Sequence, residues 1–241
     1  MFFFDPLYFM IALPGLLLAL WAQWRVNSAY SKYGKIANGR NMTGEQVAQF
    51  LLQKTGLAGT VNIAGTPGNL TDHYDPRDRT LYLSYDVAKQ PSVAAMGIVA
   101  HEVGHAMQHA EAYGPLQLRM AIVPAVNIGS RLGFVVFFIG FILAAWIRVG
   151  GGLTDTLIWL GVFMISGTAL FSLLTLPVEL NASSRAKAML AQVGLVQGNE
   201  TGEVKSVLDA AAMTYVAAAA SSILTLLYYV LLAGRVTGRR R

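Results

Sequence analysis

Hydrophobic residues are concentrated in four long runs that carry almost no charge, and polar residues fill the stretches between them. A helix needs about 20 apolar residues to cross a bilayer, and each run is close to that length or longer. We therefore predict four transmembrane helices. They cover residues 6–24, 120–147, 156–178 and 210–234.

The order of these runs predicts how the chain crosses the membrane. The first run has no basic segment before it and no small-residue cleavage site after it, so we expect a retained anchor rather than a secretory signal. Residues 148–155 are a short glycine-rich link, so the second and third runs should form a hairpin. The two polar stretches, residues 25–119 and 179–209, then emerge on the same side of the membrane.

The longer polar stretch has the pattern of a small α+β lobe. Thr43 and Gln46 have the spacing of a capping box, which starts a helix. Residues 60–63 are a short strand candidate, and residues 79–84 alternate in the manner of a half-buried strand. A long helix is predicted over residues 91–113, ended by a Gly-Pro pair. The predicted fold is a mainly α membrane protein, with four transmembrane helices and a small α+β lobe on one membrane face.

The composition supports a membrane protein and excludes several other classes. Charged residues make up 13% of the 241-residue chain, against about 25% in an average soluble domain. The mean hydropathy is +0.48, so part of the apolar surface should face lipid. The chain has no cysteine, which excludes disulfides, thiolate zinc sites and cysteine nucleophiles. The arginines at the C-terminus favour a phospholipid surface as partner and not a nucleic acid.

The predicted long helix contains the sequence His101-Glu102-Val103-Gly104-His105. Residues four apart lie on one face of a helix, so the two imidazoles can occupy two corners of a tetrahedral zinc site. Glu102 faces the same cavity but points past the metal. There it can take a proton from a zinc-bound water and pass it to a leaving amine.

A catalytic zinc takes three protein ligands and one water, so the two histidines need a third partner. His109 continues the four-residue spacing of His101 and His105. However, a helix rises by about 12 Å over the eight residues from His101 to His109, so these two side chains cannot bind one ion. We expect His109 to pack or hydrogen-bond near the site, which leaves His73 or a carboxylate, although a turn role is the simpler expectation for His73. We predict Glu179, because it follows the third run and emerges on the side of the histidines. Asp75 and Asp78 lie in a segment rich in turn-forming residues, where an Asp side chain usually hydrogen-bonds to the nearby backbone.

Several different short motifs, distributed along nearly the whole chain, are typical of one protein family. They occupy residues 72–84, 100–108, 118–119, 123–124, 176–179, 182–183 and 211–217. In these motifs and in the order of its spans, the sequence resembles the bacterial membrane-bound neutral zinc metallopeptidases of the YugP type.

The resemblance implies a zinc-dependent endopeptidase built into the membrane. It does not imply which substrate is cleaved, and its ligand pattern agrees with Glu179. We expect one Zn²⁺ per chain and a peptide or membrane-protein substrate. Related glutamate-zinc peptidases often carry Asp four residues after the ligand glutamate, where this chain has Ser183. Either Asn181 or Ser183 is then left to orient a zinc-bound imidazole.

Three further features have two interpretations each. Residues 81–84 are either an internal strand or an exposed edge beside the metal that pairs with substrate backbone, and the resemblance favours the edge. Arg131 is either a functional charge inside the membrane or a residue near the interface, and we favour the interface because the second run is longer than one span requires. Tyr215 is either a hydrogen-bond donor to a developing oxyanion or an interfacial aromatic.

We predict a zinc-dependent membrane endopeptidase that hydrolyses peptide bonds with a zinc-activated water and Glu102 as general base. The alternatives are a non-catalytic zinc-binding membrane scaffold and a zinc transporter. A purely structural zinc site has no need of Glu102. A transporter would place its ligands inside the spans, whereas His101 and His105 precede the second run.

The positive charges near the membrane predict an orientation. Eight lie on the catalytic side and five on the other, so the positive-inside rule favours a cytoplasmic active site, in a bacterial plasma membrane. The catalytic-side residues are Arg25, Lys32, Lys35, Arg40, Arg119, Arg185, Lys187 and Lys205; the others are Arg148, Arg235, Arg239, Arg240 and Arg241.

Overall fold

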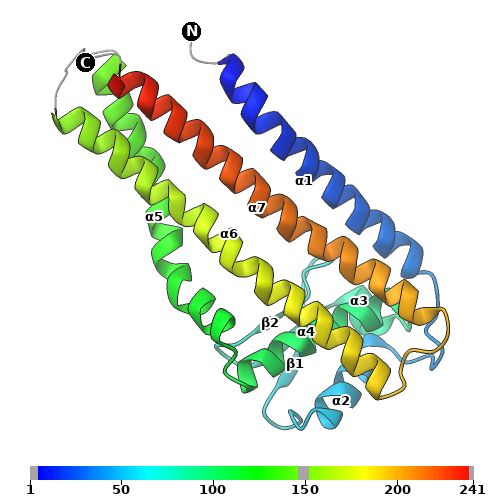
Figure 1. Cartoon of the computed structure of the whole chain (residues 1–241). Coiled ribbons are helices and arrows are strands. Elements are labelled where there is room, and N and C mark those ends of the chain that lie inside the picture. The colour runs from blue at the N-terminus through cyan, green and yellow to red at the C-terminus, as the bar shows by residue number, and fades with distance from the viewer. Residues whose placement is uncertain (1–4, 146–151, 239–241) are drawn as a thin grey trace. The chain divides into compact units, whose positions relative to one another are not determined.

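A computed structural model describes residues 5–145 and 152–238, and within these ranges the chain is mainly helical with one small sheet. This confirms the predicted fold class (Figure 1). In these two ranges, four helices are long and apolar enough to cross a membrane: α1, α5, α6 and α7. The elements are α1 (Pro6–Tyr33), α2 (Gly44–Lys54), β1 (Asn62–Thr66), β2 (His73–Asp75), β3 (Thr80–Ser84), α3 (Tyr85–Lys89), α4 (Val93–Ala110), α5 (Gly114–Ala145), α6 (Gly152–Gln192) and α7 (Glu200–Gly238).

The chain divides into two compact units. The helical unit comprises residues 1–20, 118–176 and 215–241, and the mixed unit comprises residues 21–117 and 177–214. The mixed unit contains the sheet, helices α2 to α4 and the remaining parts of the long helices.

Close helix contacts hold the helical unit together, and apolar side chains cover its surface. A Cβ built on Gly161 of α6 would lie 2.6 Å from Phe137 of α5, so a side chain at this position would separate the two helices. Phe137 also meets Tyr229 of α7 with ring centroids 4.9 Å apart. On the outside, Leu16 and Leu17 of α1 are more than half exposed. Exposed leucines on long apolar helices fit a lipid environment.

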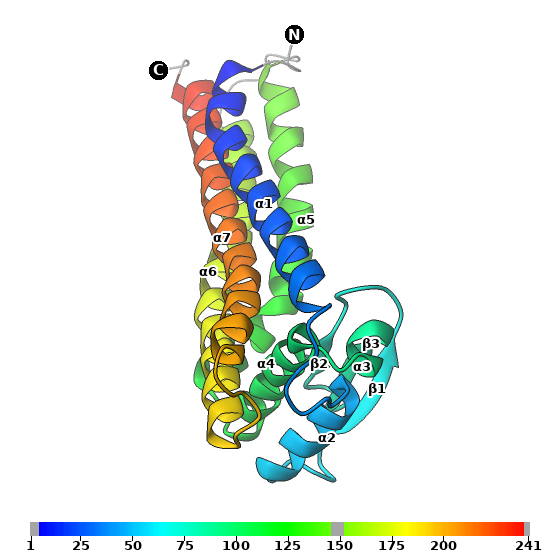
Figure 2. The same cartoon turned by 90° about the vertical axis from the view of Figure 1, so that its right-hand side faces the viewer.

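The sheet of the mixed unit has the order β1-β3-β2. Strand β1 runs parallel to β3, with Ile63 opposite Leu81, whereas β2 runs antiparallel to β3, with Tyr74 opposite Leu81. Helix α3 lies beside β1 and β3 (Figure 2). The expectation that residues 81–84 form an exposed edge is therefore wrong. Strand β3 is the central strand, and Leu81 and Leu83 are buried in the core. Their apolar side chains gain more from this core than from an edge position.

The first strand lies further along the chain than predicted. It covers Asn62–Thr66 instead of residues 60–63. The preceding segment is a turn, in which Val61 donates its amide to the Leu57 carbonyl at 3.1 Å. Pairing with β3 then continues through Gly65 and Thr66, beyond the end of the predicted strand and although glycine favours turns. Strand pairing outweighs local turn preference here.

The helix boundaries show where local stop signals do not act as expected. Thr43 forms the predicted capping box with Gln46, and α2 begins directly after it. Helix α4 begins after Ser92 as expected and ends at Ala110. The Gly-Pro pair opens α5, because proline is tolerated in a first helical turn, where its missing N–H has no partner to lose. No new helix starts near Glu179, because α6 continues through Pro177 to Gln192.

Part of the expected hairpin link lies outside the described residues. Residues 146–151 are not described, and residues 152–155 already belong to α6. Arg148 and the last three arginines are likewise outside the described ranges.

Candidate metal centre

Three side chains of the mixed unit converge on one point. His101 and His105 lie one turn apart on α4, and the Nε2 atom of each is 3.2 Å from Oε2 of Glu179 on α6. One donor atom from each residue lies within 4.8 Å of the others. Each imidazole is 11% exposed and the Glu179 side chain only 3%. The structure thus brings together the three residues predicted as ligands.

Gly104 allows this convergence. It lies between the two histidines, and a Cβ at this position would be 2.7 Å from the backbone oxygen of Ala182 on α6. Without a side chain, the α4 backbone approaches α6 closely enough for histidine and glutamate side chains to meet. A larger residue at position 104 would push the helices apart.

The outer ring nitrogens of both histidines are held by polar side chains. Nδ1 of His101 is 3.1 Å from Oγ of Ser183, and Nδ1 of His105 is 3.0 Å from Oε1 of Gln108. Of the two residues considered for orienting an imidazole, Ser183 makes the direct contact. Asn181 acts one step away, because its Oδ1 accepts a hydrogen bond from Gln108 at 2.9 Å.

Glu102 is also buried, at 8% exposure, but it is not part of the converging group. Its Oε2 accepts a hydrogen bond from the backbone amide of Tyr74 in β2 at 2.9 Å. Burial raises the pKa of the Glu102 carboxyl above its ordinary value, and the imidazoles of His101 and His105 oppose this rise only in part. A carboxylate with a raised pKa is a stronger base.

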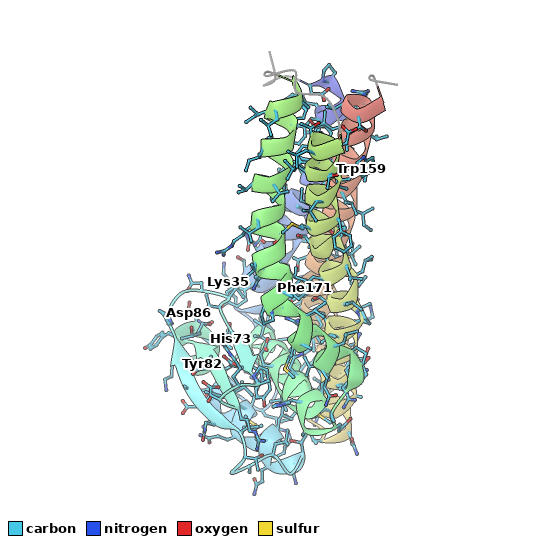
Figure 3. All side chains as sticks on the ribbon, turned by 90° about the vertical axis from the view of Figure 1, so that its left-hand side faces the viewer. Lys35, His73, Tyr82, Asp86, Trp159 and Phe171 are labelled. Carbon is cyan, nitrogen blue, oxygen red and sulfur yellow. The ribbon has the colours of Figure 1, made fainter. Side chains whose placement is uncertain are left out.

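The two remaining histidines lie beside this group of ligands. His109 contacts the phenol oxygen of Tyr74 through Nδ1 at 2.8 Å, as expected for a residue that hydrogen-bonds near the site. His73 is exposed on β2, where Nδ1 contacts the Thr71 carbonyl at 2.8 Å and the ring stacks on Tyr82 (Figure 3). Among the described residues, neither histidine belongs to the converging group.

Comparison with known proteins identifies the family. Residues 8–234 match the family model described as "Putative neutral zinc metallopeptidase". The chain belongs to this family. It is also 42% identical over 226 residues to the Bacillus subtilis (strain 168) protein named "Putative membrane protease YugP", covering 94% of this chain and 96% of that protein. The resemblance inferred from the motifs is confirmed. No solved structure matches the chain.

The converging group fits the zinc that the family name implies. Two imidazole nitrogens and one carboxylate oxygen are a ligand set that zinc takes in hydrolytic sites. Burial alone would lower the pKa of His105, but the hydrogen bond to Glu179 and the charges of Glu102 and Glu179 outweigh it, so that the pKa is raised. The site thus favours positive charge, and a divalent cation would supply it.

Two residues that contact the site, Gln108 and Tyr74, were not predicted from the sequence to have a role there. Gln108 lies within the family motif, three residues after His105, and this spacing places it on the same helix face. That spacing was the available signal. The backbone amide of Tyr74 carried no such signal, because its contact with Glu102 depends on how β2 packs against α4.

Arg131 and Tyr215 lie in the helical unit. Arg131 is exposed on α5, and Tyr215 is partly buried on α7. The roles predicted for them remain predictions.

Proposed function

We propose that this protein is a zinc-dependent membrane endopeptidase in which Glu102 is the general base. The observation that carries the proposal is the buried group of His101, His105 and Glu179 with a second buried carboxylate, Glu102, on the same helix turn. A zinc site that served only to stabilise the fold would gain nothing from burying this second carboxylate, since burying a charge is costly. This supports a hydrolase over a structural scaffold.

The proposed chemistry assigns one task to each group. Bound zinc would lower the pKa of a coordinated water and polarise the scissile carbonyl. Glu102 accepts the proton of the attacking water and delivers it to the leaving amine. The Tyr74 amide holds one carboxylate oxygen of Glu102, which restricts the rotation of that side chain. We assign Tyr215 the donation of a hydrogen bond to the developing oxyanion.

Peptidase action is favoured over zinc transport by the position of α4. Helix α4 carries both histidines and is not among the four helices identified as candidate membrane spans. Transporters place their binding sites inside the spans, near the bilayer midplane. Histidines on a helix outside the candidate spans therefore favour a peptidase.

Metal removal tests the proposed activity. The purified full-length protein in detergent should cleave an unfolded protein substrate, lose this activity on treatment with a zinc chelator, and regain it when zinc is restored. Cleavage that persists after complete zinc removal would contradict the proposal.

Tyr215→Phe, which removes one hydroxyl group, should lower the turnover while the zinc content stays unchanged.

We also propose that the catalytic site lies on the cytoplasmic side of a bacterial plasma membrane, on the basis of the charge distribution. The chain has no cysteine, so a single one can report accessibility. Tyr85 is suitable because it is 75% exposed, and its neighbour Ser84, at 0%, is a buried control. Tyr85→Cys should react with an impermeant thiol reagent only after the cells are opened, and Ser84→Cys in neither case. Labelling of Tyr85→Cys in intact cells would place the site outside.

A further inference from the structure

Gln108 connects the metal centre to the backbone of α6. Its side chain is fully buried, at 0% exposure. Its Nε2 donates to the Val178 carbonyl at 2.8 Å and to Oδ1 of Asn181 at 2.9 Å, while its Oε1 is 3.0 Å from Nδ1 of His105. All the hydrogen-bonding atoms of the amide group are therefore engaged.

The direction of these hydrogen bonds follows from the partners. A backbone carbonyl can only accept, so the NH₂ group of Gln108 must face Val178. Asn181 also presents its oxygen, because Oδ1 accepts from Nε of Arg185 at 2.7 Å and a guanidinium can only donate. The oxygen of Gln108 is thereby directed to His105. Since that oxygen cannot donate, Nδ1 of His105 must carry the hydrogen.

We propose that Gln108 is a positioning residue that fixes the ring orientation and the protonated nitrogen of His105. With the hydrogen held on Nδ1, the Nε2 atom points towards Glu179 and offers its lone pair to the metal. The inference rests on zinc binding as set out in the proposed function, but it requires no peptide cleavage.

His101 provides an internal comparison. Its Nδ1 contacts the hydroxyl of Ser183, and a hydroxyl group can either donate or accept. This contact orients the ring without dictating which nitrogen is protonated. The constraint imposed by Gln108 on His105 is therefore the stricter one, and we expect Ser183→Ala to weaken zinc binding less than a change at Gln108.

Zinc affinity tests the role of Gln108. The full-length protein in detergent is titrated with zinc against a chromophoric chelator. Gln108→Met keeps a side chain of similar length and removes the amide group, and we expect it to weaken zinc binding by about 10- to 100-fold. Gln53→Met is the matched control, since Gln53 is exposed on α2, and its affinity should equal that of the wild type. Unchanged affinity in Gln108→Met would overturn the proposal.

Nuclear magnetic resonance of the zinc-loaded protein gives a second readout that a purely structural role would not change. With ¹⁵N-labelled histidine, the four histidines of the chain give few ring signals. The wild type should show a slowly exchanging His105 proton on Nδ1, and Gln108→Met should lose this protection. A His105 proton on Nε2 in the wild type would overturn the proposal even if the variant fails to fold.

These measurements also separate this inference from the proposed function. Zinc binding with the expected His105 signal but no peptidase activity would refute the proposed function and leave the positioning role of Gln108 intact. A wild-type protein that binds no zinc would overturn both.

Discussion

Replacing Glu102 by Gln is expected to abolish peptide cleavage while leaving zinc bound. The amide keeps the shape of the side chain and removes its basicity, and the three residues of the metal centre are unchanged. General-base catalysis by a positioned side chain typically contributes about 10²- to 10⁴-fold to the rate, so we expect a rate loss of at least that order. Initial rates on a fluorogenic peptide and zinc analysis of the same preparation provide the measurement.

Glu45→Gln is the matched control for this variant. Glu45 lies on α2, where it forms an exposed ion pair with Lys89 at 2.9 Å. Exposed ion pairs contribute about 0–1 kcal/mol to stability, so this change should leave both cleavage and zinc content unaltered. A near-wild-type rate in Glu102→Gln would exclude Glu102 as the base. Parallel loss of zinc and activity would instead indicate that Glu102 supports metal binding.

Replacing Glu179 by Ala is expected to remove one tightly bound zinc per chain. The carboxylate is the only group of the converging three that does not come from α4, and its Oε2 lies 3.2 Å from both imidazoles. Without it, two histidines one turn apart remain, which is fewer than the three protein ligands of catalytic zinc sites. Zinc stoichiometry after dialysis, with circular dichroism to show that the helices are intact, provides the measurement.

His73→Ala distinguishes Glu179 from the alternative ligand. His73 is exposed and contacts the Thr71 carbonyl, so its loss should leave zinc binding unchanged. If Glu179→Ala retained its zinc and His73→Ala lost it, the assignment of the third ligand would be wrong.

Much of the local structure could be predicted from the sequence. The capping box of Thr43 and Gln46 starts α2 as expected, because all its hydrogen bonds lie within four residues. The same holds for the spacing of His101 and His105, since the helical repeat alone places them on one face. Three of the apolar runs lie within α1, α6 and α7, and the second lies within α5 as far as residue 145, because the length and hydropathy of a run are properties of the segment itself.

The approach of Glu179 to the histidines was partly predictable. Counting the spans places Glu179 and α4 on the same side of the membrane, but it gives no distance. The distance depends on the contact of Gly104 with Ala182, which follows from helix packing. Pro177 precedes Glu179 by two residues, and only the structure shows that α6 continues through this proline.

By itself, the sequence determined the four long apolar helices, the paired histidines and the family. These depend on short-range periodicity or on motifs that can be read in order along the chain. Only the tertiary structure decided that β3 is central, that the Tyr74 amide reaches Glu102, and that Gln108 faces His105. Each of these depends on which backbone or side-chain atom of a distant segment becomes the partner. The choice is made when buried polar groups must all find hydrogen bonds within one packed core, and no local pattern encodes it.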